Sequence, residues 1–228
     1  MRFSLIITAF LLLPGTILFA QEKQYTKSQD SDPEAISLIN NLRSKYDGYK
    51  TMQADFRLDI ALPGRPVEKQ VGKIKREGDR VRFRLGDQEG IITDKAAYII
   101  QHDNKEVMIN NLPDPEEMTG VLTPQTLFNF YEGDSFVVAL MGEDVTEGRL
   151  LQSVELKPVD RDNSEFTKLR LMIDKKKKEL VSIRAFTPNG VNYTFHLDKT
   201  TGNVALPAGT FAFRQKEFPG YHVEDLRY

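Results

Sequence analysis

The sequence contains no cysteine and no tryptophan, and only three histidines. Without cysteine the chain has no disulfide, no thiolate zinc site, no cysteine nucleophile and no lipid-modified cysteine of its own. The 31 Lys and Arg residues nearly balance the 33 Asp and Glu residues, so the formal net charge is −2 and no cationic excess favours general nucleic-acid binding. These absences exclude classes of function but select none.

The longest apolar run lies at the N-terminus. Leu5 to Leu13 follow the positively charged start Met1-Arg2, and Ala20 precedes a polar stretch. This layout is typical of a secretory signal peptide and is too short for a membrane span of about 20 apolar residues. An uncleaved anchor is the alternative. We expect a signal peptide over residues 1–20, a flexible lead-in over residues 21–31 and a single domain over residues 32–228.

The periodicity of apolar residues predicts one helix followed by many strands. Asp32 and Pro33 are suited to the N-cap and first turn of a helix, and Gly48 to its end. From Thr51 the period changes to two and continues through most of the chain. We therefore expect a mainly β fold of about ten to twelve sequential, mostly antiparallel strands with a few helices. A sheet of this size must curl, close or split.

Side chains suited to catalysis or metal binding do not form a recognisable set. His196 and Asp198 lie two apart on a predicted strand and could share a metal ion, but no third ligand is evident. Asp114, Glu116 and Glu117 of the acidic loop 111–120 could gather calcium, but a solvated loop is the better interpretation. Whether this loop docks a partner stays open. There is no G-x-S-x-G motif and no P-loop. We expect no enzyme activity, no catalytic residue, no cofactor and no metal.

A run of four lysines, Lys175 to Lys178, stands at a predicted hairpin turn. An exposed turn is the simplest interpretation, because lysine side chains are readily solvated. Contact with anionic lipid or with a partner is the alternative.

Apolar side chains of the strands and of the short segment near residue 127 are expected to point to a common side of the sheet. They are Met52, Phe56, Leu58, Phe83, Leu85, Ile99, Met108, Leu127, Phe128, Met172 and Phe186. Two interpretations remain open, an ordinary filled core and a hydrophobic cavity covered by helices. Periodicity does not separate them, because both require the same alternation.

Six short segments follow one another in an order similar to that of a known family. They are the first helix with MQADFRLDI, then VGKIKREGDRVRFRL, EGIITDKAAYIIQHDNKEVMIN, LTPQTLF, VELKPVDRDNSEFTKLRLMID and LPAGTFAFRQKEFPGYHVED. Together they extend from about Ala35 to Asp225, behind the signal peptide. In this order they resemble the periplasmic outer-membrane lipoprotein carrier family (LolA-like proteins).

The resemblance implies an unclosed antiparallel β-barrel with a helical lid over a cavity for acyl chains. The protein would be a monomeric chaperone in the periplasm of a Gram-negative bacterium. It would take lipoproteins from an ATP-driven inner-membrane release complex to an outer-membrane acceptor, without binding nucleic acid. The expected lipid-binding residues are Leu42, Tyr46, Met52, Phe56, Leu58, Phe83, Leu85, Leu127, Phe128, Met172 and Phe186.

Two rival functions remain. One is an envelope lipid-binding or stress-sensing half-barrel protein that regulates a membrane partner. The other is a catalyst or polymer-binding module with a filled barrel.

The resemblance also suggests one latch residue. In the family, the arginine of a Lys-Arg-Pro motif holds the lid by hydrogen bonds, and Lys75-Arg76 aligns with it. Arg76 is therefore the candidate latch, with an exposed strand arginine as the alternative. Glu77 stands where the family has proline and Leu85 where it has tryptophan, so the latch and the cargo could differ from those of the family.

Overall fold

The computed structural model describes residues 27–112, 135–162 and 164–227. Within these ranges the chain forms one α-helix, two 3₁₀ turns and twelve strands. The elements are η1 (Ser28–Asp30), α1 (Pro33–Asp47), β1 (Thr51–Ala61), β2 (Glu68–Glu77), β3 (Arg80–Leu85), β4 (Gln88–Ile92), β5 (Ala97–Gln101), β6 (Glu106–Asn110), β7 (Phe136–Thr146), β8 (Arg149–Pro158), β9 (Lys168–Asp174), β10 (Glu179–Phe186), β11 (Asn192–Gly202), η3 (Gln215–Glu217) and β12 (His222–Asp225).

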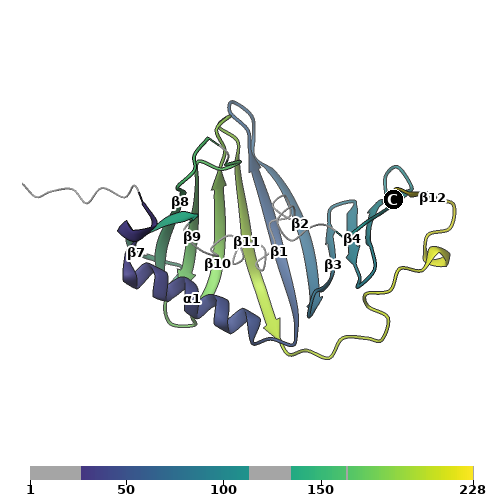
Figure 1. Cartoon of the computed structure of the whole chain (residues 1–228), viewed down its shortest axis with the longest axis horizontal. Coiled ribbons are helices and arrows are strands. Elements are labelled where there is room, and N and C mark those ends of the chain that lie inside the picture. Colours follow the sequence, from purple (N-terminus) through teal and green to yellow (C-terminus); the bar gives the residue numbers. More distant parts are fainter. Residues whose placement is uncertain (1–26, 113–134, 163, 228) are drawn as a thin grey trace, which may run out of the picture.

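All twelve strands belong to one curved sheet that does not close (Figure 1). Their order is β12-β6-β5-β4-β3-β2-β1-β11-β10-β9-β8-β7, so β7 and β12 form the two edges. Every pair is antiparallel except β12 with β6, which is parallel. The predicted fold, a mainly β protein built as an unclosed half-barrel, is confirmed.

Helix α1 begins and ends where the sequence predicts. Pro33 occupies the first turn and the helix ends before Gly48. The side chain of Asp32 has a different role from the predicted helix cap, because its carboxylate accepts a hydrogen bond from the Leu140 amide at 3.0 Å. Ser31 and Asp32 also bond to Val138, so the residues directly before α1 are fixed to β7.

Helix α1 covers the inner face of the sheet, which we define as the face that carries Met52, Ala54 and Phe56. The buried cluster beneath it joins Ala35, Ile39, Leu42 and Tyr46 of the helix to inner-face side chains of β1, β2, β3 and β7 to β11. Ile39, Leu42 and the facing Ile183 are at most 1% exposed. One half of the half-barrel is therefore a filled core.

A second buried cluster lies on the opposite, outer face of β4, β5 and β6. It consists of Ile91, Ile100, Val107 and Phe218, with Tyr98, Phe213, Tyr221 and Val223 packed against it. The C-terminal tail, residues 203–227, leads from β11 to β12 (Figure 1). Its Phe213, Phe218 and Tyr221 supply the rings that cover this cluster. This tail is also held by hydrogen bonds from Arg82 to the Thr210 carbonyl at 3.1 Å and between His102 and the Tyr221 hydroxyl at 2.9 Å.

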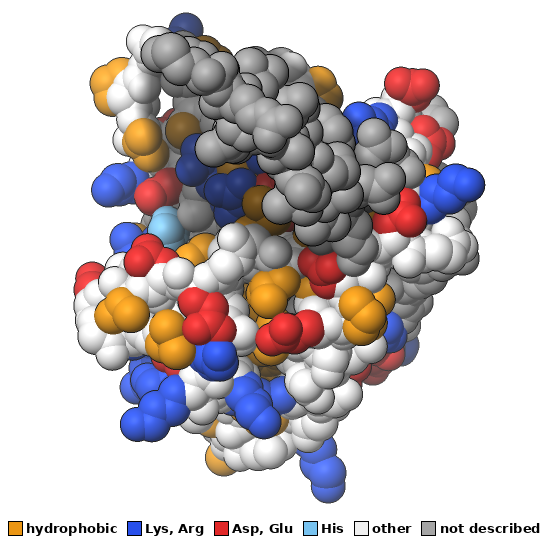
Figure 2. All heavy atoms as spheres, turned by 90° about the vertical axis from the view of Figure 1, so that its left-hand side faces the viewer, with side chains coloured by type: hydrophobic (Ala, Val, Ile, Leu, Met, Phe, Trp, Pro, Cys, Tyr) orange, Lys and Arg blue, Asp and Glu red, His pale blue; other side chains and the backbone are white. Residues whose placement is uncertain are grey.

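The β7 edge presents apolar side chains that are separated by charged ones (Figure 2). Met141 and Val145 of β7 and Leu150 of β8 are the exposed large apolar residues of these two strands. No helix in the described part of the chain is long and apolar enough to cross a membrane.

Candidate functional site

Four of the predicted lipid-binding residues belong to the filled core. Leu42 and Tyr46 of α1 belong to the same buried cluster as Met52 and Phe56 of β1, and all four side chains are at most 6% exposed. They lie on the predicted face, but helix α1 covers them. Acyl chains could reach them only if α1 moved away from the sheet.

Tyr46 is additionally fixed by its hydroxyl group. The hydroxyl oxygen accepts a hydrogen bond from the Leu180 amide at 3.3 Å. Burial raises the pKa of Tyr46 to about 12, so the phenol remains neutral. This contact ties the last turn of α1 to the start of β10.

Arg76 holds the same end of the helix. Its side chain is 6% exposed, which contradicts the alternative of an exposed strand arginine. One terminal nitrogen donates to the Tyr46 carbonyl at 2.7 Å and lies 3.3 Å from the Tyr49 carbonyl. Carbonyls at a helix C-terminus lack partners within the helix and carry partial negative charge, so a cation is stabilising there. Burial lowers the pKa of Arg76, against the opposing effect of Asp47. That Arg76 acts as a latch during transfer stays a prediction.

Two glycines of the inner face allow aromatic rings to lie flat on the sheet. A Cβ atom at Gly72 would lie 2.3 Å from the Phe56 ring, and one at Gly90 would lie 2.1 Å from the Phe83 ring. Only glycine leaves room for such a close approach. The floor of the half-barrel is consequently apolar without being filled by upright side chains.

Beyond the helix-covered half, the inner face carries apolar side chains that are only half-buried. Cross-strand pairing places Leu58, Phe83 and Leu85 on this face, as predicted. Ile99 and Met108 are direct partners on β5 and β6 and continue the same face. We call the half-buried inner-face residues Leu58, Ile60, Phe83, Leu85, Ile99 and Met108 the inner strip. Leu58, Ile60, Ile99 and Met108 belong to neither buried cluster.

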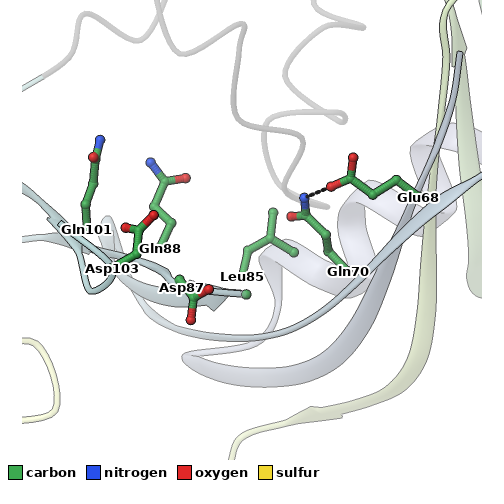
Figure 3. Close-up of a pocket in the computed structure, with 8 residues that line it drawn as sticks. Glu68, Gln70, Leu85, Asp87, Gln88, Gln101 and Asp103 are labelled. Carbon is green, nitrogen blue, oxygen red and sulfur yellow. Dashed lines mark hydrogen bonds between the residues drawn. The ribbon is translucent and has the colours of Figure 1, made fainter.

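A polar pocket of about 500 Å³ borders the inner strip (Figure 3). Gln88, Gln101 and Asp103 stand on one side of it and Glu68 and Gln70 on the other, with Leu85 between the two groups. Gln70 donates a hydrogen bond to Glu68 at 2.7 Å. Leu85, which the resemblance aligns with a tryptophan, therefore lies at the boundary between the apolar floor and the polar pocket.

Met172 and Phe186 are not on the predicted side of the sheet. Met172 pairs with Ser182, and Phe186 pairs with Lys168, in register with the outer face. A β-bulge between Leu180 and Ser182 reverses the phase of β10, so that Ile183 and Ala185 face inward instead of Phe186. In β9, Leu169, Leu171 and Ile173 take the inner face, which leaves Met172 outside. The prediction that these two residues line the common side is wrong.

Leu127 and Phe128, the acidic loop from Asp114 to Glu117 and the signal peptide lie outside the described residues. Among the described residues, no three His, Asp or Glu side chains are placed to hold a metal ion. His196 and Asp198 have separate partners on the outer face. His196 lies 3.4 Å from Asp59, and Asp198 accepts two hydrogen bonds from the Arg57 Nε and Nη atoms at 2.9 and 3.0 Å.

Comparison with known proteins yields similarity in fold. No family model and no curated protein sequence matches the chain. An uncharacterized conserved protein from Thermus thermophilus superposes with a TM-score of 0.55 at 10% identity, over 86% of this chain and 99% of that one. A LolA superfamily protein from Nitrosomonas europaea gives a TM-score of 0.40 at 10% identity, over 78% and 97%.

The MucA/MucB complex structure from Pseudomonas aeruginosa gives a TM-score of 0.46 at 18% identity, over 80% of this chain and 62% of that chain. At these identities the likeness concerns the fold alone. The chain is thus similar in fold to the Thermus protein.

Proposed function

We propose that this protein is a periplasmic carrier that holds the acyl chains of lipoproteins against its inner strip, without catalysing a reaction. The observation that carries the proposal is that Leu58, Ile60, Ile99 and Met108 are apolar, share the inner face and belong to neither buried cluster. Its partners would be an ATP-driven release complex in the inner membrane and an acceptor at the outer membrane.

The energetics of the cargo require such a surface. The transfer of an acyl chain of about 15 methylenes from a membrane to water costs about 12 kcal/mol of free energy, at about 0.8 kcal/mol per methylene. An apolar floor that includes the low, flat ring of Phe83 would offset much of this cost. Release then requires that the bound and empty states differ little in free energy.

The polar pocket supports the same proposal. Acyl chains on the inner strip would place the polar part of the cargo beside Gln70, Gln88 and Gln101, whose amides both donate and accept hydrogen bonds. Apolar and polar parts of one amphipathic ligand would each meet a matching surface.

The direct test uses the chain without residues 1–20, added to spheroplasts that synthesise a labelled triacylated lipoprotein. We expect labelled lipoprotein in the soluble fraction, bound one-to-one to this protein. Mass spectrometry of the purified protein could instead identify a different bound lipid. That result would support lipid binding by the inner face and contradict lipoproteins as the cargo. Absence of both would favour a filled barrel with another function.

A matched pair of variants tests whether the inner face, and not the outer face, binds the lipid. Met108→Glu puts a charge on the inner strip, and Met172→Glu puts the same charge on the outer face. We expect Met108→Glu to reduce lipoprotein release about tenfold or more, because an unpaired carboxylate beside an acyl chain is costly. The Met172→Glu variant should release as much labelled lipoprotein from the spheroplasts as the unchanged protein does. Equal effects of the two variants would contradict the assignment of the inner strip as the lipid site.

A further inference from the structure

The outer face of β8, β9 and β10 carries a group of cations around one aromatic ring. We call Lys157, Lys168, Arg170 and Arg184 the outer basic cluster. Three of these cations surround Phe186, with the Lys168 ammonium 4.9 Å, the Arg184 guanidinium 4.7 Å and the Arg170 guanidinium 5.7 Å from the ring centre. Phe186 is thus a half-buried aromatic ring over which three cations gather.

One carboxylate within the cluster neutralises one of the four charges. Glu155, 3% exposed, lies 2.6 Å from Arg170, 3.1 Å from Lys168 and 3.4 Å from Lys157. Burial acts to raise the pKa of Glu155, but the hydrogen bonds from Arg170 and Lys168 outweigh it and hold the pKa below its usual value. Glu155 is therefore ionised at neutral pH. The four cations and this one carboxylate leave a net charge of +3 within the outer basic cluster, although the net charge of the whole chain is −2.

The positions of the two arginines show where an anion would be stabilised. Arg170 and Arg184 are direct cross-strand partners, and like charges in that arrangement repel each other. Glu155 is the partner of Arg170 on the opposite side, from β8. No carboxylate of the described residues is paired with Arg184. An anionic group above the pair would accept hydrogen bonds from both guanidinium groups and remove the repulsion.

We propose that the outer basic cluster binds an acidic segment of a partner protein, with carboxylates over Arg170 and Arg184. This goes beyond the proposed function, since the cluster and the inner strip lie on opposite faces of the sheet. Cargo and partner could therefore be bound at the same time. Charge attraction of this kind accelerates association and selects the partner by its sign.

The surroundings of the cluster favour a polypeptide over a membrane surface. Exposed Asp160, Asp162 and Glu165 stand in the loop that joins β8 to β9, beside the cluster in the chain. An anionic bilayer is a broad plane and would meet these carboxylates as well. A narrow acidic segment can lie across three strands, about 10 to 15 Å, and avoid them.

The test uses the cargo-free protein and a fluorescein-labelled deca-glutamate peptide, followed by fluorescence anisotropy at low and at increasing salt. We expect binding that weakens as salt rises, and an about three- to tenfold loss of affinity in Arg184→Gln, the size typical of one exposed charge-assisted contact. Arg57→Gln is the matched control, because Arg57 lies on the same face but is already paired with Asp198. It should bind within about twofold of the unchanged protein.

Several results would overturn the proposal. They are an absence of peptide binding at low salt, an equal loss in the Arg57 and Arg184 variants, and binding to phosphatidylglycerol vesicles that the peptide does not compete. Because Arg184 is exposed, thermal unfolding of Arg184→Gln should match that of the unchanged protein, which separates loss of binding from loss of fold. The measurement involves no lipid cargo, so its failure is distinguishable from failure of the carrier proposal.

Discussion

The two halves of the sheet bury opposite faces. Under α1, the strands from β7 to β11 together with β1 bury their inner face against the helix. At the other end, β4, β5 and β6 bury their outer face against the C-terminal tail. A strand needs only one packed face to be stable, so the tail frees the inner face of β5 and β6 from a structural role. Among the described residues, the half-barrel thereby combines a filled core with an inner face on β5 and β6 whose Ile99 and Met108 belong to neither buried cluster.

The largest expected effect is on the helix-covered half. Leu42→Ala leaves a cavity beneath α1 at a side chain that is 1% exposed. We expect a loss of about 3 to 4 kcal/mol in the free energy of unfolding, measured in urea. Val71→Ala, at an exposed side chain of β2, should change it by less than about 0.5 kcal/mol. A small effect of Leu42→Ala would mean that α1 is only loosely packed and can be displaced by cargo.

A smaller effect is expected where the tail covers the outer face. Phe218→Ala removes the ring that covers Ile100 and Val107. We expect about 2 to 3 kcal/mol of local destabilisation, less than for the helix because a terminal segment can relax or open by itself. Hydrogen exchange should accelerate in residues 204–227 and in β4 to β6, and not in α1. Leu226→Ala, at an exposed side chain of the same tail, is the control. Faster exchange throughout the chain would show that the two halves unfold together.

The smallest effect on stability is expected at the joint between helix and sheet. Arg76→Leu removes the hydrogen bonds to the carbonyls at the end of α1, at a cost of about 1 to 2 kcal/mol. We expect uptake of lipoprotein to persist and delivery to acceptor membranes to change, measured as transfer from the purified complex. Arg84→Leu, on the outer face of β3, should transfer normally. Normal transfer by Arg76→Leu would contradict the latch.

Much of the fold follows from local sequence. Pro33 and Gly48 mark the bounds of α1, and alternation from Thr51 onward identifies the strands and the face shared by Met52, Phe56 and Leu58. The sequence also carries a sign of the second cluster, because the run AAYIIQ has apolar residues in both phases of its alternation, so its outer face is suited to burial as well. That sign was not sufficient to identify the tail as the cover.

The errors at Met172 and Phe186 have a common origin. Within a strand the period of two is reliable, but it does not fix which phase faces inward when both phases carry apolar residues. Met172 shares its phase with Lys168 and Arg170, a signal that argued for the outer face. Phe186 follows a bulge, and one extra residue reverses every later position in the strand.

The sequence by itself determined the type and order of the elements, because helix caps, glycine positions and the alternation of apolar residues act over a few neighbouring residues. Only the tertiary structure decided which face each half of the sheet buries, that Arg76 meets the end of α1, and that three cations gather around Phe186. Those outcomes depend on strand register and on contacts between residues far apart in the chain, such as Arg76 with Tyr46 and Glu155 with Arg170. Pairing energies between distant segments, not local preferences, select among the possible registers.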